Sequence, residues 1–451
     1  MLRDTIFALS SAPGRAGIAV VRVSGPKAAE IYCALTRRTL PEARVALLVR
    51  LFDPVEGGLL DEGLALWFPG PRSYTGEDSV EFHLHGGVAV VAAVLESMGR
   101  IEGARPAEPG EFTRCAFMAG KIDLTEAEGV IDLIDAETSA QRRQALRQAG
   151  GALGNLYDRW RDRLVVILAH YEAVLDFPDE DLPDDVVARI NKDIAVLSDE
   201  VTQHLDDKRR GERLRNGVRI AIIGPPNAGK SSLMNMLAQR DVAIVSETAG
   251  TTRDVIETHL DLGGLPVTLV DTAGLRETVD AVEAEGVRRA HLAADQSDLK
   301  VLVLDQRASG AEGQMREQID AETIVVLNKS DLELGAMDVA AYNQSPNYLK
   351  ALGRYRISVK TGVGIDQFID GLTSAVRDML DVTDAPIITR ARHRAALEDV
   401  RHVLTSSQSA PLPELAAEDM RLAVRALGRI TGSVDVEDLL DVVFRDFCIG
   451  K

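Results

Sequence analysis

The chain has 451 residues, of which 45% are hydrophobic and 27% are charged, and this length favours two to four globular domains over a single core. It carries 51 basic against 70 acidic residues, a formal net charge of −19. That balance disfavours non-specific binding to nucleic acids or anionic membranes. A nucleic-acid partner would therefore have to bind a local basic cluster.

The cysteines and the apolar segments bear on the compartment. Cys33, Cys115 and Cys448 form no C-x-x-C pair, so we expect reduced thiols in a cytosolic setting. The first residues, "MLRDTIFALSSAPG", lack the apolar run of a signal peptide. The apolar run at 88–95 is too short to span a bilayer. We therefore expect a soluble, cytoplasmic protein with no membrane partner.

Residues 1–118 combine short strand-like segments with turns rich in glycine and proline. The segments 17–25 ("GIAVVRVSG") and 63–76 ("GLALWFPGPRSYTG") are typical of strands bounded by turns, and 79–87 ("SVEFHLHGG") alternates as a strand does. The apolar run that follows, 88–95, is predicted to be helical. These segments together predict an N-terminal α+β domain.

Residues 119–214 are predicted to be helical. Thr125 and Glu128 match a capping box at the start of the first helix. The acidic, proline-broken stretch 176–185 interrupts the pattern. It could hold a metal, but a solvated break between two helices is the favoured interpretation.

Residues 215–376 alternate strand-like and helix-like segments, which predicts a mostly parallel sheet with helices on both faces. Gly263 and Gly264 stand where a hairpin turn would join two of the strands. Residues 377–451 are predicted to be helical again. Because helices flank the α/β segment, we expect it to be inserted into one all-α domain made of 119–214 and 377–451.

A phosphate-binding loop is predicted at 224–231. The sequence "GPPNAGKS" fits G-x-x-x-x-G-K-[ST], directly after a strand-like segment and before a helix-like one. In such a loop backbone amides point at the phosphates, Lys230 reaches the β and γ oxygens, and Ser231 can ligate Mg²⁺. The residues expected at the phosphates are Asn227, Ala228, Gly229, Lys230, Ser231 and Ser232.

Three further motifs follow in the order of a GTP-binding domain. "DTAG" (Asp271, Thr272, Ala273, Gly274) would place Asp271 near the metal and the Gly274 amide near the γ-phosphate. "NKSD" at 328–331 resembles the guanine-reading motif of GTPases, in which Asp331 would accept hydrogen bonds from guanine N1 and N2 while Asn328 and Lys329 shape the pocket. Adenine lacks that donor pair, so GTP is the expected nucleotide. Ser358, Val359 and Lys360 resemble the accompanying base-side loop.

The residue after the DxxG glycine is unusual. Many GTPases use a glutamine there to orient the attacking water, whereas this chain has Leu275, which is apolar. Another group must therefore orient the water. The nearby carboxylates are Glu277, Asp280, Glu283 and Glu285, and most of them are expected to be ordinary helix-surface residues.

The motifs "GPPNAGKSS", "SETAGTTRD" and "DTAGLRE", with "PGRAGIAVVRVSG", "RPAEPGEFTRCAF" and the ending "FCIGK", resemble the MnmE (TrmE) family of tRNA-modification GTPases along the whole chain. The resemblance implies a multidomain protein with an N-terminal α+β folate-binding and dimerisation domain, a central helical domain and an inserted Ras-like α/β P-loop G domain. It also implies a homodimer and K⁺-stimulated GTP hydrolysis.

The resemblance assigns roles to G-domain residues. Asn227 would help to hold K⁺, together with backbone groups of the loop around Ser246, Thr248 and Thr251, and Thr252 would join Ser231 on Mg²⁺. Glu283 would orient the attacking water through a bridging water. The remaining loop residues implied at the nucleotide are Glu247, Ala249 and Gly250.

The resemblance also implies a tetrahydrofolate derivative, 5-formyl- or methylene-tetrahydrofolate, bound by the N-terminal domain. The matching residues are Arg22, Glu81, Lys121 and Lys451, and cations with one carboxylate suit an anionic glutamate tail and the donor/acceptor edge of a pterin. His83 and His85 share one strand face, as metal ligands might. A structural or pocket-lining role is favoured for them because no third ligand presents itself.

The family acts with an FAD-dependent partner, MnmG (GidA), on C5 of the wobble uridine (U34) of certain tRNAs, where an aminomethyl-type (carboxymethylaminomethyl) group is placed. The basic clusters 208–215 and 390–394 are candidate contacts for RNA or the partner, and solvated helix faces and hinges are the alternative. A different function, that of a regulatory ribosome-assembly GTPase without chemistry on RNA, also fits the G domain. The N-terminal half and the ending favour tRNA modification.

In the ending "FCIGK", Cys448 stands where a prenylation box would carry its lipid-bearing thiol. Gly450 and Lys451 do not fit such a box, and no polybasic segment precedes it, so a lipid-anchored GTPase is disfavoured. The resemblance instead brings Lys451 to the folate. Cys448 is then either a catalytic thiol or a packed one.

Overall fold

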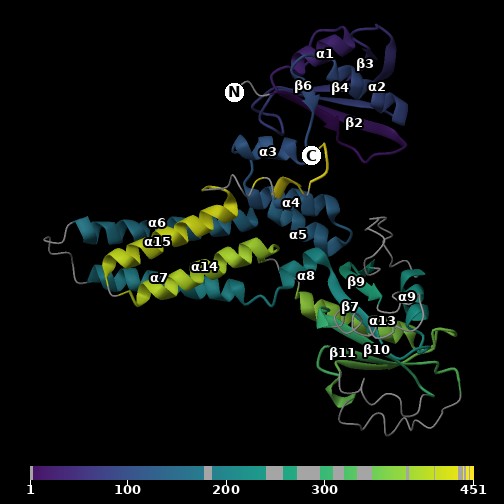
Figure 1. Cartoon of the computed structure of the whole chain (residues 1–451), viewed down its shortest axis with the longest axis vertical. Helices are drawn as coiled ribbons and strands as arrows, with labels where there is room; N and C mark the ends of the chain where they lie inside the picture. Colours follow the sequence, from purple (N-terminus) through teal and green to yellow (C-terminus); the bar gives the residue numbers. More distant parts are fainter. Residues whose placement is uncertain are drawn as a thin grey trace, which may run out of the picture. The chain divides into compact units, whose positions relative to one another are not determined.

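The computed structural model describes residues 4–176, 185–239, 257–271, 295–307, 319–332, 348–381, 385–410, 412–434, 440, 443–445 and 447–450 (Figure 1). The chain divides into two compact units. Unit 1 comprises Met1–Ile131, Gln148–Leu182 and Ser409–Lys451, and unit 2 comprises Asp132–Arg147 and Pro183–Gln408. Each unit is described by itself.

Unit 1 begins with a six-stranded sheet and two helices. Its strands are β1 (Thr5–Leu9), β2 (Ala16–Ser24), β3 (Leu47–Phe52), β4 (Leu59–Phe68), β5 (Ser79–Gly86) and β6 (Ala104–Pro106), and its helices are α1 (Ala28–Thr36) and α2 (Val88–Gly99). The strand order is β3-β4-β5-β2-β1-β6, and all neighbours are antiparallel except β1 and β6. The predicted α+β fold is confirmed.

The alternation of β2 divides its side chains between the two faces of this sheet. Val21 and Val23 are fully buried in a core that also contains Tyr32 of α1 and Met98 of α2. Arg22, between the two valines, therefore points to the opposite face. The sequence pattern that forms the core thus also presents a cation on the face that the two helices leave uncovered.

The helices that continue unit 1 are α3 (Glu111–Met118), most of α4 (Leu124–Asp135), α6 (Ala152–Asp176) and α15 (Pro413–Thr431), whereas nearly all of α5 (Ser139–Ala149) belongs to unit 2. Helix α6 packs against α15, with an ion pair of 2.9 Å between Arg421 Nη2 and Glu172 Oε1. Helix α15 ends where Gly432 takes a φ of 88°, a left-handed C-cap that glycine adopts without strain. The predicted long helical stretch is therefore several helices, and its segments from both ends of the chain pair with each other.

The predicted capping box of α4 was displaced by two residues. Asp123 Oδ1 accepts the backbone N–H of Glu126 at 2.7 Å, and Glu126 Oε2 accepts the N–H of Asp123 at 2.8 Å. The reciprocal pair is therefore Asp123 and Glu126, while Thr125 lies inside the first turn and Glu128 is buried. The spacing rule was satisfied by two overlapping pairs, and the sequence alone did not show which one begins the helix.

Unit 2 contains a second six-stranded sheet. Its strands are β7 (Val218–Ile223), β8 (Glu257–Leu262), β9 (Leu265–Asp271), β10 (Leu299–Asp305), β11 (Thr323–Asn328) and β12 (Gly353–Arg356). The order is β12-β11-β10-β7-β9-β8, parallel throughout except for the β8–β9 hairpin. Gly263 and Gly264, with φ of 61° and 87°, form the predicted turn of that hairpin.

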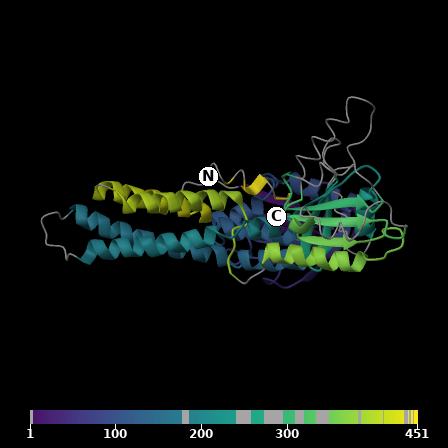
Figure 2. The same ribbon diagram turned by 90° about the horizontal axis from the view of Figure 1, so that it is seen from below.

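Two helices, α9 (Lys230–Gln239) and α13 (Ile365–Leu380), pack on one face of this sheet, and Figure 2 shows α13 in light green along it. Leu233 of α9 and Phe368 of α13 are fully buried there. On the other face, within the described residues, Ile319 and Tyr348 cover Val325 and its neighbours. A short 3-10 helix, η1 (Tyr348–Lys350), carries Tyr348. The predicted α/β domain is confirmed.

The remaining helices of unit 2 are α7 (Asp185–Leu205), α8 (Arg210–Asn216) and α14 (Ala391–Gln408). Arg394 of α14 is only 10% exposed and pairs with Asp207 and Glu212, each at 2.7 Å. Arg213 of α8 pairs with Asp298 at 2.7 Å. The two basic clusters are therefore largely engaged inside unit 2, and the interpretation of them as solvated helix faces is wrong for these arginines.

No helix within the described ranges combines the length and the apolar character that a membrane span requires.

The cap of α4 gives a stability prediction. Replacing Asp123 by Ala should lower the free energy of unfolding of unit 1 by about 1 kcal/mol, because the N–H of Glu126 loses its acceptor. Asp123→Asn keeps an acceptor and should lie close to the wild type. Both tryptophans, Trp67 and Trp160, belong to unit 1, so tryptophan fluorescence in a urea titration follows its unfolding. Equal losses in the two variants would contradict the cap.

Candidate functional site

The loop between β7 and α9 has the backbone that a phosphate-binding loop requires. Gly224 and Gly229 take φ of 147° and 101°. A Cβ would stand 2.1 Å from the Val303 carbonyl oxygen at Gly224, and 2.2 Å from Asn328 Nδ2 at Gly229. The two glycines of the motif therefore allow neighbouring strand ends to touch the loop. The amides of Ser231 and Ser232 lie in the first turn of α9, where helix N–H groups are free to bind an anion.

Lys230 lies over this loop. Its Nζ donates to the carbonyl oxygens of Gly224 and Pro225, each at 2.9 Å. Asn227 has a φ of 61° and its side chain is exposed, whereas Ala228 is buried. The predicted phosphate-contacting residues thus form one continuous loop, with the ammonium of Lys230 above it.

Asn328 connects the predicted guanine-reading motif to the phosphate loop. Its side chain is 3% exposed, and its Nδ2 donates to the Ala228 carbonyl at 2.9 Å. Its Oδ1 accepts the N–H of Lys329 at 2.7 Å and that of Val359 at 3.2 Å. One amide therefore satisfies groups from three loops.

Asp331 is held by the base-side loop. The Ser358 hydroxyl donates to Asp331 Oδ1 at 2.6 Å, and the Thr361 N–H donates to Ser358 Oγ at 3.1 Å. The hydrogen bond from Ser358 lowers the pKa of Asp331, and the charge of Lys360 lowers it further. An ionised carboxylate in this position is the acceptor that the guanine N1 and N2 hydrogens require.

The structure brings the carboxyl ends of the parallel strands to one edge, where ligands bind in open α/β sheets. Asp271, the last residue of β9, lies opposite Ile222 of β7, and Asn328 lies opposite Asp305 of β10.

Other predicted residues lie outside the described ranges: Ser246, Glu247, Thr248, Ala249, Gly250, Thr251, Thr252, Thr272, Ala273, Gly274, Leu275, Glu277, Asp280, Glu283, Glu285 and Lys451.

In unit 1, Arg22 and Glu81 face each other on β2 and β5. Arg22 Nε and Nη2 approach Glu81 Oε1 at 3.0 and 2.9 Å, and both side chains keep about a fifth of their surface exposed, 22% and 20%. The guanidinium of Arg22 lies 5.3 Å from the ring centre of Tyr74 and 5.6 Å from that of Phe112. A charged pair with aromatic neighbours on a sheet face can bind a flat, polar ring.

Lys121 belongs to the same region. Its Nζ donates to the carbonyls of Pro71 (3.0 Å) and Ser73, and the hydroxyl of Tyr74 lies 3.0 Å from Thr113 Oγ1. The loop between β4 and β5 carries Pro71, Ser73 and Tyr74, so it contacts both Lys121 and Arg22. Of the four residues predicted for the folate site, Arg22 and Glu81 form a direct pair, and Lys121 is linked to them through this loop.

The two histidines of "HLH" have separate partners. His85 Nδ1 lies 2.8 Å from Asp61 Oδ1, and its N–H donates to Asp61 Oδ2 at 2.9 Å. His83 Nε2 lies 3.6 Å from Glu81 Oε2. No cluster of three potential metal-ligating side chains occurs among the described residues. The structural or pocket-lining role of the pair stays a prediction.

The last residues of the chain pack on the N-terminal sheet. Ser10 Oγ donates to the Gly450 carbonyl at 2.8 Å, Ile449 forms an antiparallel bridge with Pro109, and the Gly110 N–H donates to the Cys448 carbonyl at 3.4 Å. Just before them, Phe444 and Phe447 pack on Leu124 of α4. Ser10 follows β1, the strand that pairs with β2 next to Arg22.

The terminal segment is shaped for this position. Gly450 has a φ of 99°, and a Cβ there would stand 2.0 Å from the Leu9 carbonyl oxygen. Cys448 is exposed. The backbone of Cys448 is thus held against Gly110, while its thiol reaches solvent.

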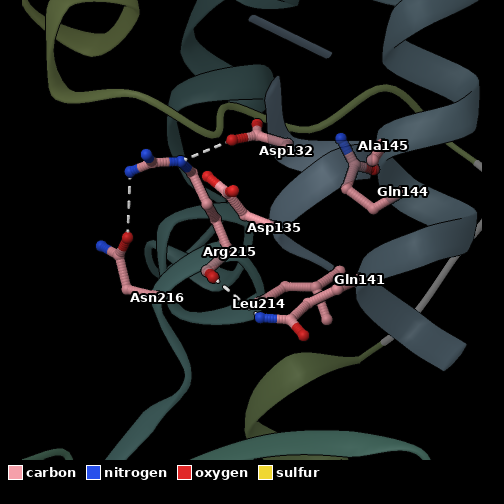
Figure 3. A pocket seen from close by; sticks show the side chains of 8 residues that line it. All are labelled: Asp132, Asp135, Gln141, Gln144, Ala145, Leu214, Arg215 and Asn216. Atoms are coloured by element: carbon pink, nitrogen blue, oxygen red, sulfur yellow. Dashed lines mark hydrogen bonds and ion pairs between the residues drawn. The ribbon is translucent and has the colours of Figure 1, made fainter. Parts of the chain in front are cut away.

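A polar pocket of about 90 Å³ lies elsewhere in unit 2 (Figure 3). Asp132 Oδ1 accepts hydrogen bonds from Arg215 Nε at 2.8 Å and Arg390 Nη2 at 2.7 Å, and Gln141 Nε2 donates to the Arg215 carbonyl at 3.0 Å. Arg215 precedes β7 and Arg390 follows α13. The Asp132 carboxylate therefore contacts both ends of the segment that contains the second sheet, residues 215–390. This gives the pocket a structural role.

Comparisons with known proteins identify the family. Residues 124–448 match the family model described as the MnmE helical domain, and residues 5–121 match that described as the GTP-binding protein TrmE N-terminus. A tRNA modification GTPase MnmE of Parvibaculum lavamentivorans is 54% identical over 99% of this chain and 100% of its own length. The chain belongs to the MnmE family of tRNA modification GTPases.

Other relatives are similar over nearly their whole length. The tRNA modification GTPase MnmE of Rhodospirillum rubrum is 51% identical over 100% of both chains. The mitochondrial 5-taurinomethyluridine-[tRNA] synthase subunit GTPB3 of Danio rerio is 47% identical over 99% of this chain and 93% of that protein. As a member of the family, the chain is a GTPase of tRNA modification.

The sequence reasoning missed residues that belong to these sites. Tyr74 and Phe112 flank Arg22, and Ser10 holds Gly450, but all three are distant in sequence from their partners. Asp305, which contacts Lys329, could have been predicted from the sequence. It ends a predicted strand, as Asp271 and Asn328 do, and the strand ends of a parallel sheet share one edge.

The docking of the terminal segment is testable by substitution at Gly450. Gly450→Ala should release residues 447–450, because the new Cβ would meet the Leu9 carbonyl and the backbone would be strained. Hydrogen exchange at the Gly110 amide should then accelerate about tenfold or more. Gly58→Ala, where a Cβ meets nothing within 4 Å, is the matched control. Unchanged protection of Gly110 would contradict the packed ending.

Proposed function

We propose that this protein is a K⁺-stimulated GTP hydrolase that acts with an FAD-dependent, MnmG-type partner on C5 of the wobble uridine (U34) of certain tRNAs. The group installed is proposed to be of the aminomethyl type, carboxymethylaminomethyl. One observation carries the proposal: a chain of this family has a guanine-nucleotide site in unit 2 and, in unit 1, a charged aromatic site beside its docked ending. The relative from Danio rerio, named as a 5-taurinomethyluridine-[tRNA] synthase subunit, supports tRNA uridine as the substrate.

GTP is proposed to bind across the loops that Asn328 joins. The amides of residues 227–232 and the Lys230 ammonium would hold the phosphates, and Asp331 would accept from the guanine edge. These residues fit GTP, because Gly224 and Gly229 place no side chain over the backbone of the loop and Asp331 is ionised, as the guanine hydrogens require. Ser231, in the first turn of α9, and Thr252 would hold Mg²⁺ near Asp271, and the metal would neutralise charge on the phosphates.

K⁺ is proposed to bind beside the phosphates. The backbone carbonyl of Asn227 is taken by Lys329, but its exposed side chain keeps an amide oxygen, a ligand that suits an alkali cation. Backbone groups near Ser246, Thr248 and Thr251 would complete the site. The cation would supply the positive charge that other systems take from an arginine. Glu283 is proposed to orient the attacking water, since Leu275 is apolar.

Unit 1 is proposed to hold 5-formyl- or methylene-tetrahydrofolate as one-carbon donor. Tyr74 and Phe112 offer aromatic surface next to Arg22, and Glu81 can accept from the N–H groups of a pterin. Arg22, Lys121 and Lys451 would pair with the anionic tail. Cys448 would lie close to this site through the docking of Gly450 on Ser10, either as a catalytic thiol or as a packed one.

The domain organisation is part of the proposal. Residues 1–118 would form the folate-binding and dimerisation domain of a cytoplasmic homodimer. Residues 119–214 and 377–451 would form the helical domain, with the G domain, 215–376, inserted. The pairings of α6 with α15 and of α7 with α14 support this insertion, because each joins residues from before and after the G domain.

The test is the state of the wobble uridine in cells. A strain lacking this protein should lose the C5 modification of its tRNA, measured by mass spectrometry of nucleoside digests, and the full chain should restore it. A chain without residues 448–451 should not restore it, although its GTP hydrolysis should remain close to that of the full chain because the nucleotide site lies in unit 2. Intact modification in the deletion strain would contradict the proposal and favour a regulatory ribosome-assembly GTPase.

A further inference from the structure

Asp305 lies at the end of β10, beside the guanine-reading motif. It is in register with Asn328, the last residue of the neighbouring strand β11. Its side chain is 16% exposed, and its Oδ2 accepts a hydrogen bond from Lys329 Nζ at 2.7 Å. The carboxylate and the ammonium therefore form a half-buried pair, a geometry in which the charge of one partner fixes the position of the other.

The same ammonium contacts the phosphate loop. Lys329 Nζ also donates to the carbonyl oxygen of Asn227 at 2.7 Å. Asn227 and Lys329 both take positive φ, 61° and 63°, which costs free energy for residues with a side chain. Contacts that fix both residues must offset that cost. The link from Asp305 through Lys329 to Asn227 is one that reaches both.

Asp305 is itself held from the opposite side. Arg307 donates to it through its backbone N–H at 3.0 Å, its Nε at 3.2 Å and its Nη2 at 2.9 Å. The hydrogen bonds of Arg307, followed by that of Lys329, hold the pKa of Asp305 well below its usual range. The carboxylate is therefore ionised and fixed in direction.

The neighbouring Gln306 supports the same loop. It is 1% exposed, and its Nε2 donates to the Leu332 carbonyl at 2.6 Å. Its backbone N–H donates to the Asn328 carbonyl at 3.2 Å, and its Oε1 accepts from Arg356 Nη2 at 3.1 Å. The segment 305–307 thus contacts the guanine-reading loop at several points, and Asp305 reaches the phosphate loop through the Lys329 ammonium.

We propose that Asp305 is a positioning residue for guanine-nucleotide binding, whose carboxylate holds the Lys329 ammonium against the Asn227 carbonyl and so fixes the phosphate loop against the base-reading loop. The proposal rests on the proposed assignment of 328–331 to the guanine. Asp305 contacts no part of the nucleotide in this account. It acts on GTP and GDP alike, because both need the two loops at a fixed separation.

This role predicts a particular kinetic signature. In Asp305→Asn the charge that fixes Lys329 is lost, and the rate of GDP dissociation and the KM for GTP should rise roughly 10- to 100-fold. The kcat at saturating GTP should change little, because binding is lost equally in the ground state and in the transition state. Selectivity for GTP over XTP should persist, because Asp331 is unaltered. Asp331→Asn, by contrast, should shift selectivity towards XTP, whose C2 carbonyl matches the amide donor.

The decisive experiment is a double-mutant cycle on the full chain, using stopped-flow release of a fluorescent GDP analogue. Lys329→Gln should accelerate release, and adding Asp305→Asn to it should have almost no further effect, because the two residues act through one link. Asp320→Asn is the matched control. Asp320, just before β11, pairs with Lys300 at the opposite end of β10 from Asp305, so GDP release from Asp320→Asn should be as fast as from the wild type.

Additive effects of Asp305→Asn and Lys329→Gln would overturn the proposal, as would a fall in kcat without a change in KM. Circular dichroism and thermal melting establish that each variant is folded. If Asp305→Asn does not fold, Asp305→Glu takes its place in the cycle, since it keeps the charge and moves it by one methylene group. GDP release, KM and kcat are measured without tRNA. A negative result here would therefore refute the role of Asp305 without refuting the proposed function in tRNA modification.

Discussion

The nucleotide site depends on one buried amide, the side chain of Asn328. It donates to the phosphate loop at Ala228 and accepts from the guanine-reading loop at Lys329 and from the base-side loop at Val359. An amide suits this position because it offers a donor and an acceptor at once. The contact is so close that Gly229 has no room for a Cβ beside it. The spacing of the P-loop motif and the asparagine of the NKxD motif are thus parts of one packing arrangement.

A second constraint acts in unit 1, where the chain's last residues pack against its N-terminal part. Arg22 and Glu81 form a pair on a sheet face, with the rings of Tyr74 and Phe112 beside Arg22. The terminal segment is seated next to β1 through Ser10 and Pro109. The ending thus takes part in the fold of unit 1.

Local patterns predicted the elements that form the sites. The segment "LKVLVLD" is β10 from its first residue to its last, and Gly263 and Gly264 form the turn of the β8–β9 hairpin as expected. The order of the G motifs predicted which strand ends meet, because parallel strands bring their carboxyl ends to one edge. Arg22, Glu81 and Lys121 came from the family resemblance. The structure pairs Arg22 with Glu81 and links Lys121 to them through the β4–β5 loop.

The predictions from sequence that were wrong or incomplete share one cause: they depend on contacts that local sequence patterns do not show. Thr125 with Glu128 and Asp123 with Glu126 satisfy the same spacing rule, and only the backbone shows that the second pair caps α4. Arg394 lies in a basic run, but its partners, Asp207 and Glu212, come from nearly two hundred residues earlier, as the structure alone shows. Tyr74 and Asp305 owe their roles to contacts of the same long-range kind. Sequence patterns report neighbours along the chain, whereas a binding site is made of neighbours in space.

The claim that Asn328 holds the nucleotide site together is tested most directly by the affinity of Asn328→Ala for GDP, measured by isothermal titration calorimetry on the full chain. Losing its three hydrogen bonds leaves buried groups unpaired in three loops, so the dissociation constant should rise by roughly 100-fold or more. The unfolding of unit 1, followed by tryptophan fluorescence, should be unchanged. A dissociation constant within about twofold of the wild-type value would contradict the account, because the binding free energy would then have changed by well under about 1 kcal/mol.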